Sequence, residues 1–82
     1  MDIKIYSTTT CAFCHALTEW LDAKGFPYKK VNTDEDPAEM AEFMSVNDGN
    51  VGVPFTVITA TDGSMTKIVG FDQRKFKEAL GV

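Results

Sequence analysis

Residues 2–25 decide the fold, and their sequence is DIKIYSTTTCAFCHALTEWLDAKG. Residues 2–6 alternate polar and apolar side chains, which is the pattern of a strand with one buried face. From Cys11 the apolar side chains recur at the helical spacing i, i+3, i+7, on Cys14, Leu17 and Leu21. Gly25 is a signal for the end of that helix. The chain therefore opens with a strand, a hydroxyl-rich loop suited to capping and a helix.

The rest of the chain continues with strand and helix signals. In order they predict a strand over 27–31, a helix from Asp36 that ends at 47–50, strands over 55–59 and 65–69 around a tight turn at 61–64, and a last helix capped by Asp72. The helix from Asp36 has an apolar stripe of Met40, Phe43 and Met44.

The order β-α-β-α-β-β-α predicts an α/β fold. Strands joined through a helix are parallel and hairpin strands are antiparallel, so we expect one mixed four-stranded sheet with helices on both faces. With 82 residues the chain has room for one domain, which we expect to span 1–82.

Composition excludes several classes of protein. Eight basic and twelve acidic side chains give a formal charge of −4, which disfavours nucleic acids and anionic membranes as partners. No apolar run approaches the roughly 20 residues of a membrane helix. Residues 1–6 show neither a basic region nor a long apolar stretch, so we expect no signal peptide and a cytoplasmic protein.

The chemistry of the chain centres on Cys11 and Cys14, a C-x-x-C at the start of a helix. Free N–H groups and the positive end of the helix dipole favour an anion there, so the thiolate of Cys11 is favoured. Cys14 lies one turn inward on the same face and is expected to be more buried. This asymmetry predicts a nucleophile, Cys11, and a resolving thiol, Cys14.

Other interpretations of the cysteine pair remain open. Both could be core residues, although Cys11 faces the loop. A zinc site would need two further ligands, and only His15 is at hand, so we predict no metal. Residues 11–15 also match the haem-attachment signature C-x-x-C-H, but four strand signals do not suit a mainly helical cytochrome.

Two more segments stand out. Pro54, after Val53, interrupts an apolar run between Val51 and Ile58, and proline in a sheet belongs at a strand start. The segment Gly70-Phe71-Asp72 precedes the last helix, where Asp72 is an N-cap and Phe71 can pack on Phe76 as a hydrophobic staple.

Together these segments resemble the glutaredoxins, which have the thioredoxin fold. The resemblance rests on residues 5–7, 11–15, 53–54 and 70–72 and runs over nearly the whole chain. It implies a cis Val53–Pro54 bond facing the cysteines. It also implies that the backbone of Val53 pairs with a bound disulfide substrate.

The resemblance also implies ligand contacts. Gly70, Phe71 and Asp72 would bind the γ-glutamyl end of glutathione, with Thr8 and Phe13 close to the substrate. Most glutaredoxins carry a lysine where this chain has Thr8, a threonine at Gly52 and a second glycine at Val69. The short chain, its acidic charge and Gly70-Phe71 make it more similar to glutaredoxin-like electron donors, which include reductants of ribonucleotide reductase and the mycoredoxins.

We therefore expect a monomeric thiol–disulfide oxidoreductase with no tightly bound cofactor. Its substrates would be protein disulfides or glutathione mixed disulfides. Its electron donor would be glutathione, as a co-substrate, or a flavoprotein of the thioredoxin reductase type. Two alternatives stay open. One is an iron–sulfur cluster carrier that uses Cys11 and glutathione; the other is a redox-inert binding module.

Overall fold

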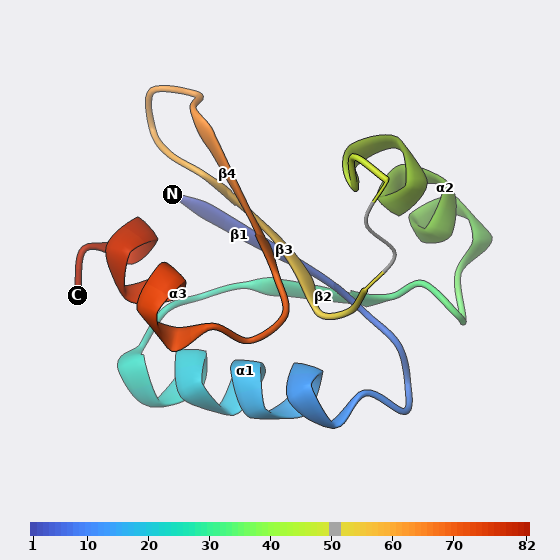
Figure 1. Ribbon diagram of the computed structural model, residues 1–82, viewed down its shortest axis with the longest axis horizontal. Coiled ribbons are helices and arrows are strands. Elements are labelled where there is room, and N and C mark those ends of the chain that lie inside the picture. Colours follow the sequence, from blue (N-terminus) through green and yellow to red (C-terminus); the bar gives the residue numbers. More distant parts are fainter. Residues whose placement is uncertain (50–51) are drawn as a thin grey trace.

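The computed structural model describes residues 1–49 and 52–82 (Figure 1). The elements are β1 (Asp2–Ser7), α1 (Ala12–Lys24), β2 (Lys29–Asn32), α2 (Pro37–Val46), β3 (Phe55–Thr59), β4 (Met65–Val69) and α3 (Gln73–Leu80). The strands form one sheet in the order β2-β1-β3-β4. β1 pairs parallel with β2 and antiparallel with β3, and β3 pairs antiparallel with β4. The predicted order of elements and the mixed sheet are confirmed.

Helices cover both faces of the sheet, as predicted. α1 and α3 lie together on one face and α2 lies on the other (Figure 1). The larger cluster of buried side chains, between the sheet and α1 with α3, consists of Ile3, Ile5, Leu17, Leu21, Ile58, Ile68, Phe76 and Leu80. The smaller cluster, beneath α2, consists of Tyr6, Phe43, Phe55 and Val57. The alternation along β1 sends Ile5 to one cluster and Tyr6 to the other.

The predicted helix ends are largely confirmed. Gly25 ends α1 with a left-handed φ of 77°, a conformation that glycine adopts without steric cost. Asp36 caps α2 by accepting the N–H of Ala38, and Asp72 caps α3. Asn50, assigned to the turn after α2, lies outside the described residues, as does Val51 at the start of the apolar run.

Three details differ from the sequence-based expectations. The N-cap of α1 is Cys11 itself, rather than a residue of the hydroxyl run before it. β2 begins at Lys29, not at residue 27, because Pro27 has no N–H to give to the ladder. In α2, Phe43 is buried and Val46 packs beside it, whereas Met40 and Met44 are 38% and 56% exposed, because the helix meets the sheet through Phe43 and its last turn.

Candidate active site

The register of the sheet brings three separate segments to one end of it. Tyr6 lies opposite Phe55, and Phe55 lies opposite Val69. The chain therefore leaves β1, enters β3 and leaves β4 at the same end, on strands about 4.8 Å apart. There the N–H of Gly70 donates a hydrogen bond of 2.7 Å to the carbonyl of Pro54. The C-x-x-C loop, the Val-Pro pair and the Gly-Phe-Asp segment thus share one end of the sheet.

The two cysteines sit at the start of α1 in different environments. Cys11 is the N-cap, and its Sγ accepts the N–H of Cys14 across 3.2 Å. Their Cα atoms are 5.3 Å apart and the structure has them joined as a disulfide. Cys14 is fully buried, whereas Cys11 is partly exposed. An N–H group aimed at a sulfur stabilises its thiolate once the disulfide is reduced.

The Val-Pro pair has the backbone geometry that the family resemblance implies. The Val53–Pro54 peptide bond is cis. Pro54 is buried at the start of β3, Val53 is half-buried, and Gly52 is exposed. A Cβ at Gly52 would lie 3.5 Å from Cγ1 of Val69, which is ordinary van der Waals contact. The space beside β4 therefore does not require glycine at residue 52.

The segment before α3 combines a turn, a packed ring and a cap. Gly70 has a left-handed φ of 80°. Phe71 packs its ring against Trp20 and Phe76, with centroids 6.0 and 6.2 Å away, which confirms the predicted staple. Asp72 accepts the N–H groups that follow it in α3 at 3.1 and 3.3 Å, which confirms the cap. The ring of Phe71 thus belongs largely to the core beneath α1 and α3.

Thr8 lies three residues before Cys11, and Phe13 lies between the two cysteines. Thr8 is half-buried, and its carbonyl accepts the N–H of Cys11 across 3.4 Å. Phe13 exposes 70% of its surface, one residue before the buried Cys14. A phenyl ring left in water beside a reactive sulfur offers apolar area to an incoming molecule.

Sequence reasoning missed a contact that fastens the loop before Cys11. Asp34 accepts the N–H and the hydroxyl of Thr9 at 3.1 and 2.7 Å. Hydrogen bonds from Thr9 hold the pKa of Asp34 below its ordinary value. The bond from the Thr9 hydroxyl has the larger effect and the bond from its N–H the smaller one. Asp34 follows the end of β2, and Thr9 follows the end of β1. The predicted parallel pairing of these two strands was therefore the one feature of the sequence that could have brought the two residues together.

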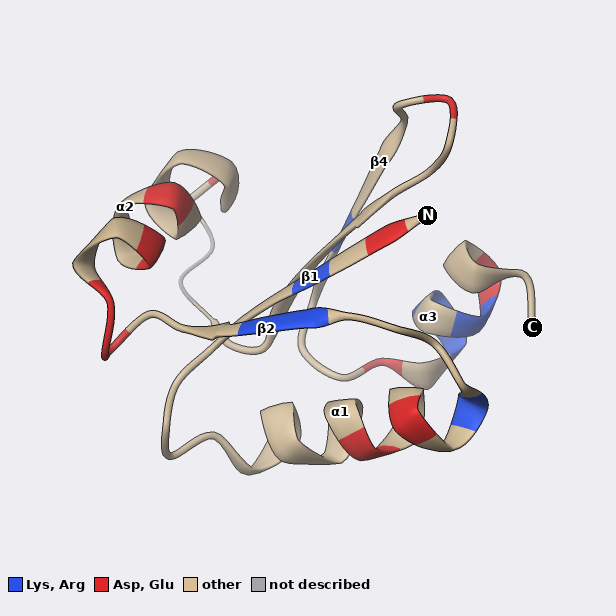
Figure 2. Ribbon diagram, turned by 180° about the vertical axis from the view of Figure 1, so that it is seen from behind, with Lys and Arg blue, Asp and Glu red and all other residues tan. Residues whose placement is uncertain are grey.

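Charge is divided unevenly around the fold. More than half of the acidic side chains lie on α1, on α2 and on the turn before α2, and others lie on β1, the β3–β4 turn and α3, whereas Lys and Arg lie chiefly on the strands and α3 (Figure 2). α2 carries Glu39 and Glu42 and no basic residue. Both carboxylates bind Lys4 of β1, at 3.1 and 2.8 Å, and Glu42 also accepts the hydroxyl of Tyr6 at 2.6 Å.

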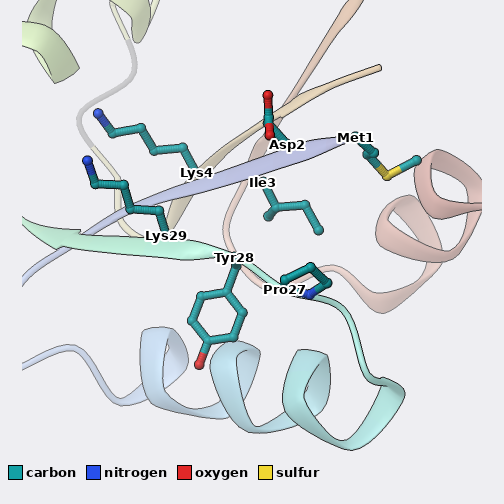
Figure 3. A pocket seen from close by; sticks show the side chains of 7 residues that line it. All are labelled: Met1, Asp2, Ile3, Lys4, Pro27, Tyr28 and Lys29. Atoms are coloured by element: carbon teal, nitrogen blue, oxygen red, sulfur yellow. The ribbon is translucent and has the colours of Figure 1, made fainter. Parts of the chain in front are cut away.

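A cleft of about 340 Å³ lies at the opposite end of β1 from the cysteines (Figure 3). It is lined by residues 1–4 and 27–29. Lys4 and Lys29 extend away from α1 there, whereas the ring of Tyr28 points toward α1 (Figure 3). Because β1 runs from this cleft toward the cysteine loop, the cleft is separate from the candidate active site.

The described residues contain neither a metal-binding cluster nor a membrane-spanning helix. Within 1–49 and 52–82, no three His, Cys, Asp or Glu side chains are grouped so that they could hold a metal ion. In the same part of the chain, no helix has the length and apolar character needed to cross a membrane.

Comparison with known proteins agrees with this geometry. The family model for glutaredoxins matches residues 3–61. An uncharacterised glutaredoxin-like 8.6 kDa protein from the rubredoxin operon of Clostridium pasteurianum is 36% identical over 95% of this chain and 96% of its own. Mycoredoxin 1 of Corynebacterium glutamicum is 35% identical over 77% of this chain and 75% of its own.

Solved structures lead to the same family. The glutaredoxin-like NrdH-redoxin of Escherichia coli, described as having a thioredoxin-like activity profile, superposes with a TM-score of 0.74. It shares 27% identity and covers 95% of this chain and 93% of its own. A glutaredoxin from Methanosarcina mazei gives 0.80 at 27% identity, over 99% and 79% of the two chains. With its C-x-x-C at the start of α1 and a cis proline at the same end of the sheet, the chain belongs to the glutaredoxin family.

Proposed function

We propose that this glutaredoxin-like redox protein reduces disulfides through both cysteines, with Cys11 as the nucleophile and Cys14 as the resolving thiol. One observation carries the proposal. Cys11 is partly exposed and accepts an N–H at the start of α1, while Cys14 is fully buried behind it. The sulfur that a substrate can reach is thus the sulfur that the helix stabilises as a thiolate.

The exchange takes place in two steps. The Cys11 thiolate attacks one sulfur of the substrate disulfide, forms a mixed disulfide with it and releases the other sulfur as a thiolate. Cys14 then gives its proton to solvent, attacks Cys11 Sγ and releases the second substrate sulfur as a thiolate, and the released thiolates take up protons from solvent. The substrate gains two electrons, and the protein ends with the Cys11–Cys14 disulfide, which its 5.3 Å Cα separation accommodates.

The substrates we propose are protein disulfides and glutathione mixed disulfides. The exposed ring of Phe13 supports an apolar contact with a protein substrate. Val53 and Pro54 lie at the same end of the sheet as the cysteines, and the backbone of Val53 would pair with an extended substrate segment. Gly70, Phe71 and Asp72 would border the same site, and Asp72 would face the ammonium group of glutathione.

We further propose that a flavoprotein reductase recharges the protein more efficiently than glutathione. Glutathione carries two carboxylates, and the position that resembles the family's lysine holds Thr8. The neighbouring helix α2 and the turn before it add negative charge. The thioredoxin-like activity profile described for NrdH-redoxin supports the same donor class.

The remaining features of the proposal follow from the chemistry. Two sulfurs suffice for the exchange, so we propose a protein of one domain, residues 1–82, that works as a monomer without a tightly bound cofactor. A disulfide reductant needs a supply of electrons to its cysteines, so we propose that it works in the reducing cytoplasm.

A trapping experiment tests the exchange. Reduced Cys14→Ser, mixed with a disulfide-bonded protein such as insulin, should accumulate a mixed disulfide, because no second thiol resolves it. Peptide mapping should place the bond on Cys11. The proposal is wrong if no adduct forms with folded protein.

The donor is tested separately. Oxidised wild-type protein is mixed either with glutathione and glutathione reductase or with thioredoxin reductase, in each case with NADPH. We expect faster NADPH consumption with thioredoxin reductase. Faster consumption with glutathione would contradict the proposed donor and leave the role of Cys11 intact.

A further inference from the structure

The loop between β1 and α1 is held by a side chain from the segment after β2. Thr9 gives its N–H and its hydroxyl to one carboxylate oxygen of Asp34, at 3.1 and 2.7 Å, and its N–H lies 3.3 Å from the other oxygen. Thr9 is two residues before Cys11. We infer that Asp34 is a positioning residue: through Thr9 it fixes the loop that presents Cys11, so that the sulfur stays aligned with the N–H of Cys14. The inference rests on the proposed role of Cys11.

The contact continues the pairing of two strands beyond their ends. Ser7 and Asn32 form the last pair of the β1–β2 register. Just beyond it, Thr33 donates its N–H to the carbonyl of Ser7 at 2.9 Å. Beyond that hydrogen bond, the segments that follow β1 and β2 are joined again by the hydrogen bonds between Thr9 and Asp34. The loop is thus tied to the sheet up to Thr9, and only Thr10 lies between that tie and Cys11.

Each acidic residue of the segment 34–36 has its own partner. Asp36 caps α2 through the N–H of Ala38 at 3.0 Å. Glu35 accepts the side-chain amide of Asn32 at 2.7 Å. Among these three acids, Asp34 is the one that is hydrogen-bonded to the active-site loop, so a substitution there isolates the loop contact.

A positioning role and a purely electrostatic role predict opposite signs. The negative charge of Asp34 near the sulfur would by itself disfavour the Cys11 thiolate, so removing that charge would lower the pKa of Cys11. If Asp34 instead keeps the sulfur aligned with the Cys14 N–H, removing it weakens that hydrogen bond and raises the pKa of Cys11. Glu35 and Asp36 on the turn, and His15 on α1, stay unchanged in this comparison.

The chain offers a matched control at the other end of β3. In the β3–β4 hairpin, Asp62 accepts the N–H and the hydroxyl of Ser64 at 2.9 and 2.7 Å, the same arrangement as at Asp34. Asp62→Ala therefore removes an equivalent pair of exposed hydrogen bonds, away from the cysteines.

The experiment follows the rate of iodoacetamide alkylation of Cys11 against pH in reduced protein, together with kcat/KM for insulin reduction. Asp34→Ala should raise the apparent pKa of Cys11 and lower kcat/KM by about threefold or more, since a displaced reactive group loses rate steeply. Thr9→Val, which keeps the charge and the shape, should change both in the same direction. Asp34→Asn and Thr9→Ser, which keep hydrogen-bonding atoms, should retain near wild-type kcat/KM.

The possible results distinguish a failure of the positioning role of Asp34 from a failure of the proposed role of Cys11. The inference is overturned if Asp34→Ala lowers the pKa of Cys11, or leaves it and kcat/KM as in Asp62→Ala, with both variants folded by urea titration. Should wild-type Cys11 itself fail to react or to reduce insulin, the proposed function fails instead. A lower kcat/KM for insulin reduction in Asp34→Ala, together with a near wild-type value in Asp34→Asn, supports the positioning role.

Discussion

The backbone N–H of Cys14 donates to the sulfur of Cys11 across 3.2 Å, so the more exposed cysteine is the N-cap of the helix that contains the buried one. In the reduced protein this N–H and the positive end of the α1 dipole favour a thiolate on Cys11. Cys14 has no such position, since its sulfur lies inside the core.

This relationship predicts one fast-reacting thiol. Alkylation of reduced protein by iodoacetamide, followed against pH, should give an apparent pKa below the free value of about 8.5. Mass mapping after partial reaction should find the label on Cys11. A first label on Cys14 would contradict the assignment of the two sulfurs.

Glutathione use should improve when a cation is placed at Thr8. Thr8→Lys adds a surface ion pair with a glutathione carboxylate worth about 0.5–1 kcal/mol, or up to fivefold in affinity. The rate of glutathione-dependent disulfide reduction should rise, and the gain should shrink at high ionic strength because salt screens the pair. Thr10→Lys, on the same exposed loop, is the control for charge alone. An equal increase in the rate of glutathione-dependent reduction in both variants would show that residue 8 does not contact glutathione specifically.

Two phenylalanines separate packing from substrate contact. Phe76 is fully buried, with its ring 6.1 Å from that of Trp20, whereas Phe13 is 70% exposed. Phe76→Ala should lower the free energy of unfolding by about 3–5 kcal/mol. Phe13→Ala should change it by less than about 0.5 kcal/mol and raise the KM for a protein disulfide. Urea titration and insulin-reduction kinetics measure the two effects, and an unchanged KM in Phe13→Ala would rule out the contact.

Acid should weaken the attachment of α2 through Glu42. Hydrogen bonds from Lys4, which has the larger effect, and from Tyr6 hold the pKa of this carboxyl below its ordinary value. A carboxyl with a lower pKa in the folded protein stabilises it above the ordinary pKa, and that stabilisation is lost as the pH falls through the folded pKa.

The variant Glu42→Gln should therefore be less stable than wild type at pH 7, and the difference should shrink below about pH 4. Urea titrations at several pH values measure it. Glu78→Gln is the control, because that carboxylate lies 3.8 Å from Arg74 on an exposed turn of α3. A pH-independent difference for Glu42→Gln would show that its charge is not involved.

Local signals made much of the fold predictable. The bounds of β3 and β4 follow from a turn at Asp62-Gly63, and the start of α3 follows from Asp72. These signals act within a few residues of the chain, so they hold in any tertiary context. The exposure of Met40 and Met44 could not be predicted in this way, because it depends on how much of α2 reaches the sheet.

The candidate site shows the same division. The C-x-x-C and its place at a helix start were visible in the sequence, and the cis bond at Pro54 came only through the family resemblance. The bond between Thr9 and Asp34 joins residues 25 positions apart, and only the parallel pairing of β1 with β2 brings them together. A contact between exposed polar side chains leaves no periodic pattern from which it could be predicted.

The most direct test of the account compares Cys11→Ser and Cys14→Ser in two reactions, insulin reduction and the removal of glutathione from a glutathionylated protein. A serine hydroxyl cannot replace the attacking thiolate. Cys11→Ser should be inactive in both reactions, while Cys14→Ser should lose insulin reduction and keep deglutathionylation, which needs a single thiol. Insulin reduction retained by folded Cys11→Ser would contradict the central claim that Cys11 is the nucleophile.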